Sequence, residues 1–551
     1  ETMPPFVRHL DPVRRRGGLL VVDPRRSATA ALVARPVDHL APVPGTDAAL
    51  LLGILHVLIA EHHIDGDYLA ARTTGFPAVA ESVTAWWPER VEQISGIPAP
   101  VVRQTARRLA AAAPHRGGAG AFILTGRGAE QSTQGTATVT AAINIALALG
   151  LPGRRGSGYG CLTGQGNGQG GREHGQKADQ LPGYRSIDDP DARAHVATVW
   201  GIEPEDLPGR GVPALELLHR LGSSDGPLGL FVHGSNLAVS GPNSERIVER
   251  LRSLDLLVVC DFVPSETAAL ADVVLPVTQW AEEEGTMTNL EGRILRRRKA
   301  IEPPEHVRSE LWIWAELARR LDAPGSWPTD PAQVYDELAR VSSGGPADYS
   351  GTSHAGLDAA EAAGIGTYWP APATAEIREQ PSPGDHPVTG TPRPFLDRFA
   401  TSDGRARLVP VTHHGPADGV RPKAPIYLVT GRVLQHYQSG AQTRRVPELN
   451  AAATDPVVEI HPLLADRLGV VMDGIVRIES ARGAAYGRVR VTPDIRPDTV
   501  FMPFHWGGPA SVNRVTSDAT DPVCGMPDFK VCAVDIHAVD ADFGERVGAT
   551  A

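Results

Sequence analysis

Apolar runs that end in turn residues recur through the first third of the chain. Residues 19–22 are apolar and precede Asp23 and Pro24, the pattern of a buried parallel strand whose carboxyl end opens toward a ligand crevice. A second run, residues 121–124, breaks at a Gly-Arg-Gly turn and leads into an alanine-rich segment, residues 136–149. This alternation predicts a first doubly wound α/β unit.

One long helix is expected between these two strands. Thr46 or Asp47 is placed to cap its first turn, and an apolar segment runs on to about residue 61. Its most apolar part, residues 48–59, is interrupted by a glycine and a histidine and is shorter than the roughly 18 residues of a membrane span. We therefore expect a buried helix and a chain without a membrane span.

The same pattern starts again in the middle of the chain. A helical segment at residues 244–254 lies among strand-like runs at residues 228–232, 256–259 and 273–275. These elements predict a second doubly wound unit, followed by a helix over residues 311–321. The region from residue 346 to residue 392 is rich in Pro, Gly and Ala and has weak periodicity, so we expect irregular surface structure there.

Short β-type runs replace this alternation after residue 425. They are separated by turn residues and comprise residues 426–429, 457–460, 475–478, 487–491 and 500–502. Such spacing is typical of a compact β-barrel of about 120 residues. The expected fold class is therefore α/β, with two doubly wound units followed by a β-barrel. The expected domain boundaries are 1–175, 176–300, 301–424 and 425–551.

Composition argues against nucleic acid as a partner and against cysteine-based metal sites. The 551 residues carry a formal net charge of −11, so the chain lacks the excess of basic residues that nucleic-acid binding needs. An anionic substrate would require a local cluster of arginines instead. The four cysteines, Cys161, Cys260, Cys524 and Cys532, are far apart and form no Cys-x-x-Cys motif. We interpret them as buried thiols in a reducing compartment rather than as metal ligands.

A glycine-crowded loop at residues 162–175 carries the most informative chemistry. Ten glycines fall from Gly153 to Gly175, against an average of about one residue in fourteen, so the backbone must turn sharply or lie against a bulky group. A flexible linker is the alternative, but linkers are padded with serine and lack interleaved Gln, Asn and Arg. Arg172 stands near the end of the loop, and its planar guanidinium can bind an oxyanion through two parallel hydrogen bonds.

Candidates for a nucleotide site lie at the ends of the predicted strands. A carboxylate such as Asp23 or Asp47 can accept both the ring N–H and the exocyclic amine of guanine. Either acid could equally be a strand-end residue or a helix cap. Backbone amides near Gly126 and Gly128, between a strand and a helix, suit a pyrophosphate. Neither pattern is specific by itself.

Several segments, in this order along the chain, together resemble the molybdenum bis(pterin guanine dinucleotide) oxidoreductases of the DMSO reductase family. They are residues 22–26, 44–47, 126–135, 162–175, 181–185, 271–276, 282–293, 430–444 and 504–530. Within the family, residues 163–165, 171–173 and 181–185 are most similar to the bacterial assimilatory nitrate reductase type. The resemblance covers nearly the whole chain and implies that the C-terminal barrel is double-psi-like.

The resemblance implies a molybdenum bis(molybdopterin guanine dinucleotide) cofactor and a set of residues that contact it. In the α/β units these are Asp23, Arg25, Asp47, Gly126, Gly128, Gln134, Gly164, Gln165, Gly171, Glu284, Gly285, Thr286 and Asn289. In the barrel they are Thr430, Gly431, Arg432, His436, Asn513 and Lys530. No residue of this chain is expected to ligate the metal. We interpret the basic run at residues 296–299 as a solvated strand edge.

The same resemblance implies a nitrate reductase catalytic subunit, which reduces nitrate to nitrite by oxygen-atom transfer at molybdenum while Arg172 holds the anion. It also implies a cytoplasmic location and an electron donor such as a ferredoxin, a flavodoxin or an NADH-linked reductase subunit. A formate dehydrogenase or a reductase of another oxyanion is the alternative within the enzyme class. A non-catalytic scaffold with the same fold is the alternative outside it.

Two departures from the family pattern lead to further expectations. The family's [4Fe-4S] cysteines and its molybdenum-ligating cysteine would precede Glu1, and none of the four cysteines matches their positions. We therefore expect an N-terminally truncated chain that is inactive alone, with [4Fe-4S] present only in the full-length protein. Residues 165–169, Gln-Gly-Asn-Gly-Gln, replace the commoner Gln-Pro-Asn-Ala-Met, which alters the expected shape of the substrate funnel.

Overall fold

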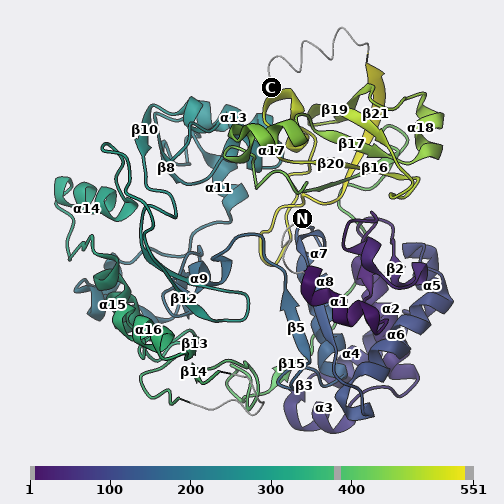
Figure 1. Cartoon of the computed structure of the whole chain (residues 1–551), viewed down its shortest axis with the longest axis horizontal. Coiled ribbons are helices and arrows are strands. Elements are labelled where there is room, and N and C mark those ends of the chain that lie inside the picture. Colours follow the sequence, from purple (N-terminus) through teal and green to yellow (C-terminus); the bar gives the residue numbers. More distant parts are fainter. Residues whose placement is uncertain (1–6, 378–385, 540–551) are drawn as a thin grey trace.

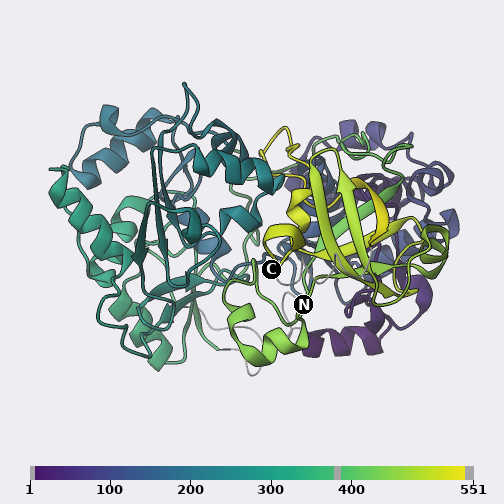
Figure 2. The same ribbon diagram turned by 90° about the horizontal axis from the view of Figure 1, so that it is seen from above.

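A computed structural model describes residues 7–377 and 386–539 of the chain. Three bodies surround the centre of the molecule in Figure 1: a helix-rich first body at the lower right, a second α/β body on the left and a β-barrel at the upper right. Figure 2 shows the first body and the barrel on one side and the second body on the other. Among the described residues, no helix combines the length and the apolar character needed to cross a membrane.

The first body is built around α2, a helix that is apolar on nearly every face. It spans Asp47–Ala60 and packs against α5 (Pro88–Ser95), α6 (Ala99–Ala112) and α8 (Gly135–Ala148). A helix covered on several sides must be apolar all round, which explains its composition. Gly53 permits the close approach of α5, since a β-carbon there would lie 2.6 Å from Cγ2 of Val91. The other helices of this body are α1 (Val7–Arg15), α3 (Gly66–Arg72), α4 (Phe76–Ser82) and α7 (Arg127–Glu130).

The start of α2 confirms the predicted helix but not the predicted cap. Thr46 occupies the N-cap position, yet its hydroxyl donates to the carbonyl of Val43 at 2.6 Å and accepts no bond from the first turn of α2. The hydroxyl therefore stabilises the preceding turn instead of the helix end. Asp47 is the first helical residue, and its acidic side chain lies where the helix dipole favours negative charge.

Both apolar runs of the first body are parallel strands, as predicted. Strand β1 (Val21–Val22) pairs with β2 (His39–Leu40), and β4 (Phe122–Thr125) pairs with β5 (Gly158–Cys161). The two pairs form separate two-stranded sheets. Asp23 thus follows the carboxyl end of β1, and the glycine loop follows the carboxyl end of β5.

A segment from far along the chain completes the first body. Strand β15 (Ala406–Arg407) pairs in parallel with β3 (Thr73–Thr74). Phe399 and Leu408, on either side of β15, are buried in the same hydrophobic core as α2. The first body therefore contains residues more than 300 positions apart in the sequence.

The second body contains the predicted parallel sheet, in the order β10-β9-β8. Its strands are β8 (Gly229–His233), β9 (Leu256–Asp261) and β10 (Val273–Pro276). Leu218 and Ile247 are buried in a core on one side of this sheet, and Ile313 of α14 packs against Cys260 and Val277 in another. The helices are α10 (Pro190–Trp200), α11 (Ala214–Arg220), α12 (Leu237–Ser240), α13 (Ser244–Arg252), α14 (Glu310–Arg320) and α15 (Pro331–Ser342). The domain boundaries expected from the sequence stay predictions.

One short helix and two short strand pairs of the second body lie near the glycine loop. Helix α9 (Gly168–Glu173) is part of the loop itself. Strands β6 (Gln180–Leu181) and β7 (Arg185–Ser186) form a short antiparallel pair after it. Strands β11 (Gly285–Thr288) and β12 (Ile294–Arg297) form a hairpin whose first strand contacts α9.

The region from residue 346 to residue 392 is not irregular throughout, contrary to the prediction. It contains α16 (His354–Ala362) and the parallel pair of β13 (Gly366–Tyr368) and β14 (Val388–Gly390). Ser353 caps α16, because its Oγ accepts from the backbone N–H of Gly356 at 3.0 Å. A good N-cap therefore sets the helix start within a segment of weak periodicity. Residues 378–385 lie outside the described residues.

The predicted C-terminal barrel is closed and has six strands in the order β16-β20-β17-β19-β18-β21. Parallel and antiparallel pairs both occur, for example β16 with β20 and β16 with β21. Five strands match the predicted runs, and β21 was not predicted. The strands are β16 (Ile426–Gly431), β17 (Val457–Ile460), β18 (Ile475–Ser480), β19 (Gly483–Val491), β20 (Thr499–Pro503) and β21 (Cys532–Val539). Helices α17 (Pro447–Ala452) and α18 (Pro462–Leu468) connect them.

Candidate functional site

The glycine loop is held between the second body and the barrel. Oδ1 of Asn167 accepts from the backbone N–H of Thr288 on β11 at 2.9 Å. On the other side, a β-carbon at Gly164 would lie 3.0 Å from a guanidinium nitrogen of Arg432, which follows β16. These contacts argue against a flexible linker and place the loop where two bodies meet.

Arg172 lies on α9, and its guanidinium has no hydrogen-bond or ion-pair partner among the described residues. The side chain is partly buried. Burial lowers the pKa of the Lys177 ammonium group, and the positive charges of Arg172 and of Arg127 on α7 act in the same direction. Three cations from neighbouring segments therefore lie close to one another at the end of the loop.

The barrel adds two more cations to this region. Nζ of Lys530 is buried and donates to the carbonyl of Thr430 at 3.1 Å. Burial, together with the charges of Arg432 and Arg127, lowers the pKa of Lys530 to about 7. Burial also lowers the pKa of Arg432, which stacks on the ring of Phe504 at 5.1 Å from its centroid and has no hydrogen bond to any described residue.

Arg127, Arg172, Lys177, Arg432 and Lys530 will be called the basic cluster. Within the described residues, only Arg127 has a hydrogen-bonded carboxylate partner, Glu130, which accepts from its guanidinium at 2.7 Å. Cations that are partly buried and lack such a partner, such as Arg172 and Arg432, are costly in a folded protein unless an anion joins them. The cluster is thus the local concentration of positive charge that an acidic chain needs to bind an anionic ligand.

Two carboxylates of the first body form a second polar centre. Asp47 opens α2, and burial raises its pKa to about 6, with a further contribution from the negative charge of Asp23. Oδ1 of Asp23 accepts from the backbone N–H of Arg25 at 2.9 Å. The structure therefore brings together two acids that are 24 positions apart, in an arrangement suited to a ligand with several N–H donors.

Arg25, predicted as a cofactor contact, forms a bidentate ion pair with the barrel. Its Nε and one terminal nitrogen donate to the two carboxylate oxygens of Glu459 at 2.5 and 2.8 Å. The guanidinium also lies over the ring of Phe501, 4.2 Å from the centroid. Both side chains of the pair are largely buried. Arg25 thus joins the first body to the barrel beside Asp23.

Two other predicted contacts use their side chains to brace loops. Gln134 donates to the carbonyl of Gly415 at 2.7 Å and accepts from the backbone N–H of His414 at 2.7 Å. Oδ1 of Asn289 accepts from the backbone N–H groups of Glu291 and Arg293, at 3.0 and 2.9 Å, and so closes the β11–β12 turn. Both residues hold the backbone of the site in place.

The same holds for two predicted contacts of the barrel. The ring nitrogens of His436 bond to the hydroxyl of Thr443 at 3.1 Å and to the carbonyl of Ala453 at 2.7 Å. Nδ2 of Asn513 donates to the carbonyl of Val239 at 2.7 Å. The protein itself satisfies these groups, and His436 and Asn513 are buried.

Glu284, Gly285 and Thr286 lie at the start of the β11–β12 hairpin. The guanidinium of Arg296 donates to the carbonyl of Gly285 at 2.9 Å and to the carboxylate of Glu284 at 3.2 Å. The interpretation of residues 296–299 as a solvated strand edge is therefore wrong for Arg296, whose side chain is 6% exposed. Its three acceptors, which include Asp358, compensate the buried charge.

Four of the six predicted glycines fall into two groups. A β-carbon on Gly126 or Gly128 would meet nothing within 4 Å, so both face open space at α7. At Gly171 and Gly431, by contrast, a β-carbon would lie 2.3 Å from the side chain of Gln176 and 2.6 Å from the ring of Phe501. Packing explains the second group, and only the first leaves room for a ligand. Gln165 is exposed, and Thr430 donates its hydroxyl to the carbonyl of Phe529 at 2.7 Å.

Sequence reasoning missed two neighbours of Arg172 as functional candidates. Glu173 is fully buried, and burial raises its pKa to about 7. Burial lowers the pKa of His174 to about 4, so this ring is neutral at physiological pH. One feature of the sequence could have pointed to Glu173. It is an acid directly after Arg172, in a loop whose only other ionisable residue is His174.

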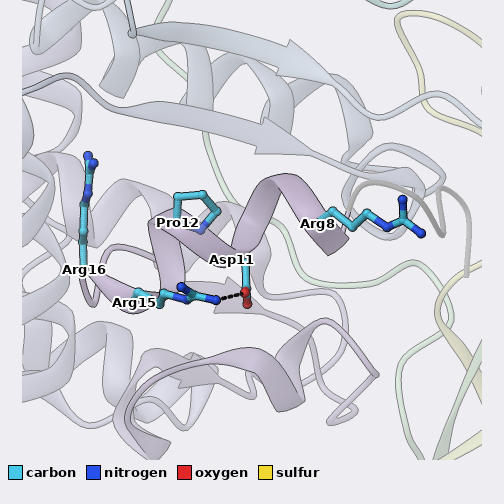
Figure 3. A pocket seen from close by; sticks show the side chains of 5 residues that line it. All are labelled: Arg8, Asp11, Pro12, Arg15 and Arg16. Carbon is cyan, nitrogen blue, oxygen red and sulfur yellow. Dashed lines mark hydrogen bonds and ion pairs between the residues drawn. The ribbon is translucent and has the colours of Figure 1, made fainter.

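The four cysteines differ in exposure, and a separate surface pocket lies on the first body. Cys260 and Cys532 are buried as predicted, but Cys524 is exposed and Cys161 is half-buried, and all four thiols are free. No group of three or more potential metal ligands occurs in the part of the chain that is described. A surface pocket on α1 is lined by Arg8, Asp11, Pro12, Arg15 and Arg16, and Arg15 donates to Asp11 at 2.9 Å (Figure 3). This pocket is formed by α1 and the residue that follows it, and it does not include the basic cluster.

Comparison with known proteins adds the family context of this arrangement. A model of the molybdopterin oxidoreductase family matches residues 11–320, and a model of the molydopterin dinucleotide binding domain matches residues 426–533. The assimilatory nitrate reductase catalytic subunit of Bacillus subtilis is 39% identical over 541 residues, which cover 97% of this chain and 72% of that protein.

More distant relatives and one solved structure agree with these matches. A nitrate reductase of Synechocystis is 35% identical and matches 95% of this chain and 71% of its own length. The F420-dependent formate dehydrogenase subunit alpha of Methanocaldococcus jannaschii is 31% identical, with 98% and 75% covered. The structure of acetylene hydratase from Pelobacter acetylenicus shares the fold, with a TM-score of 0.71 at 18% identity over 97% of this chain and 75% of that one.

Proposed function

Because this chain belongs to the molybdopterin oxidoreductase family, we propose that it is the nitrate-reducing catalytic chain of a molybdenum enzyme and that Arg172 binds the nitrate. The observation that carries the proposal is the uncommitted guanidinium of Arg172 on a glycine loop where two bodies meet. A guanidinium fork matches a planar oxyanion and keeps its charge at every physiological pH. The higher identity to two nitrate reductases than to the formate dehydrogenase supports the same substrate.

The residues present fit a pterin guanine dinucleotide. Such a group carries negative pyrophosphates and guanine-type edges with several N–H donors. The basic cluster offers buried and partly buried cations to the first, and Asp23 with Asp47 offers acceptors to the second. Gly126 and Gly128 leave space at α7 beside Arg127. We infer that these residues would hold the cofactor.

When bound, the molybdenum centre supplies the two-electron chemistry of oxygen-atom transfer. The chain's own residues then have three tasks. Arg172 binds and orients the anion, the basic cluster neutralises negative charge, and the glycine loop lets backbone approach the reacting groups without side chains in the way.

Electron supply and location follow from the type of relative. We infer a cytoplasmic enzyme that receives electrons from a ferredoxin, a flavodoxin or an NADH-linked reductase subunit, with a [4Fe-4S] centre in the full-length protein. The similarity to an assimilatory nitrate reductase supports this inference.

An assay of the cofactor-loaded full-length protein tests the proposal. We expect nitrite to form from nitrate when a reduced viologen dye supplies electrons, and we expect no oxidation of formate with an oxidised dye. Formate oxidation without nitrate reduction would overturn the proposal in favour of the formate dehydrogenase alternative. Absence of both activities in protein with full molybdenum content would favour the scaffold alternative.

Dinucleotide retention is expected to depend on pH with a maximum between about pH 6 and pH 7. Asp47 must be ionised to accept from guanine, which requires a pH above its raised pKa of about 6. Lys530 must be protonated to attract an anion, which requires a pH below its lowered pKa of about 7. On the acidic and the alkaline side of this maximum (the two limbs of the profile), the affinity for the dinucleotide falls by at most about tenfold per pH unit, because one proton is linked to binding.

The measurement is the cofactor released on dialysis between pH 5 and pH 9. The variant D47N is expected to lose the acidic limb only, and K530Q the alkaline limb only. An unchanged profile in both variants would contradict the assignment of the two limbs.

A further inference from the structure

Glu173 lies in a chain of hydrogen bonds that runs from α9 to the second body. One carboxylate oxygen accepts from Nε2 of Gln169 at 2.9 Å, and the other accepts from the hydroxyl of Thr288 at 3.2 Å. The Thr288 hydroxyl is also 3.0 Å from that of Tyr349. All three side chains of the chain Glu173–Thr288–Tyr349 are buried. The carboxyl group is thus fixed in place, next in sequence to Arg172.

The charged surroundings of Glu173 are simple. It forms no ion pair with any described residue, and the cation whose charge reaches it is Arg172. Burial raises the pKa of Glu173 to about 7. The other titratable groups that face it are neutral near that pH. His174 has a pKa lowered to about 4, and burial raises the pKa values of Tyr184, before β7, and of Tyr335, on α15.

We propose that Glu173 is a positioning residue whose charge state sets how tightly Arg172 holds the substrate anion. This inference rests on the proposed function, in which that anion is nitrate. When Glu173 is ionised, its negative charge offsets the positive field of Arg172 and repels an incoming anion. When Glu173 is protonated, Arg172 presents its full charge to the anion. Binding of the anion is therefore coupled to the uptake of one proton from solvent by the Glu173 carboxylate.

The hydroxyl chain can serve both charge states. With Glu173 ionised, the hydroxyl of Tyr349 donates to Thr288 and that of Thr288 donates to the carboxylate. With Glu173 protonated, its O–H donates to Thr288, and the Thr288 hydroxyl rotates to donate to Tyr349. Each hydroxyl is both a donor and an acceptor, so neither state leaves a buried polar group unpaired. Protonation therefore needs no movement of α9.

Coupling of this kind is reciprocal. If protonation of Glu173 strengthens nitrate binding by a given factor, nitrate favours protonation by the same factor. We expect a factor of about ten, within the usual range for coupled sites. The dissociation constant for nitrate should therefore rise about tenfold from pH 6 to pH 8.5, and binding near pH 7 should take up protons.

Titration calorimetry of nitrate into the oxidised, cofactor-loaded full-length protein tests this inference. Measurements in two buffers of different ionisation enthalpy give the number of protons taken up. The variant E173Q keeps the shape of the protonated acid, so it is expected to bind nitrate at pH 8.5 as tightly as the wild type does at pH 6, without proton uptake. The KM for nitrate should follow the same pattern, with kcat unchanged by more than about twofold.

Two matched variants separate charge from mere packing. T288V removes a hydrogen bond that favours the ionised carboxylate, so it should move the pH midpoint of binding upward while the pH dependence persists. Y349F leaves the Thr288–Glu173 bond intact but removes the acceptor that Thr288 uses when Glu173 is protonated, so it should move the midpoint downward. Equal loss of nitrate binding at every pH in E173Q and T288V would assign Glu173 a purely structural role and overturn the inference.

The outcome for the wild type distinguishes this inference from the proposed function. Nitrate binding that is independent of pH, with no proton uptake, would overturn the role of Glu173 alone. Absence of nitrate binding at every pH, in protein with full cofactor content, would overturn the proposed function itself.

Discussion

Replacement of Arg172 by alanine is expected to lower kcat/KM for nitrate by about two to three orders of magnitude. Two charge-assisted hydrogen bonds and a full positive charge are lost, and the removal of one partner from such a pair costs about 2–5 kcal/mol. No other described side chain offers the same geometry, because Lys177 and Arg432 present their charges from other segments. The measurement is steady-state nitrite formation at equal molybdenum content per protein.

Two control variants test whether the planar fork of Arg172 is needed and whether a neighbouring cation can account for the effect. R172K keeps the charge but loses the planar fork, so we expect an intermediate loss, mainly in KM. K177M removes a neighbouring cation of the basic cluster and should change kcat/KM by less than tenfold. Activity of R172A within threefold of the wild type would contradict the assignment of Arg172 as the anion-binding residue.

The second large effect is expected in stability, at the ion pair between Arg25 and Glu459. The Glu459 side chain is 3% exposed and is also paired with Arg490. E459M takes the carboxylate away from two guanidinium groups, one of them largely buried, so the free energy of unfolding should fall by about 3–5 kcal/mol. A thermal unfolding scan of the full-length protein would show this as a lower apparent Tm.

The double variant R25M/E459M is the matched control for E459M. Replacing both members of a buried pair by apolar residues avoids an uncompensated charge, so much of the lost stability should return. The apparent Tm of the double variant is therefore expected above that of E459M. A lower value would mean that Arg25 stabilises the protein mainly through its contact with Phe501.

The periodicity of the sequence was sufficient for the elements whose stability is local. Helix α2 is apolar all round and α8 is rich in alanine, and both appear close to their predicted bounds. Strand β21 could have been predicted as well, because residues 531–534 are apolar and Ile536 then alternates with the polar residues Asp535 and His537. Helix α16 was missed because its start depends on a cap rather than on an apolar stripe.

The candidate site could be predicted from the sequence only in outline. Residue type and order indicated an anion site at Arg172 and acidic groups at Asp23 and Asp47, which the structure brings close together. The sequence could not distinguish polar residues that face a ligand from those that brace the protein. The acceptor of the Asn513 side chain is the carbonyl of Val239, 274 positions away. Such partners are set by the docking of the three bodies, which no local pattern encodes.

The pairing of β15 with β3 has a consequence for how the chain matures during synthesis. Thr73 meets Ala406, so the core around α2 stays incomplete until more than 300 further residues have been made. At about 5–20 residues per second, this corresponds to a delay of roughly 20 to 70 s. The sheet of the second body is complete by Pro276 and can form during that interval. We therefore expect the second body, in the middle of the chain, to be the first part of the protein that folds during synthesis.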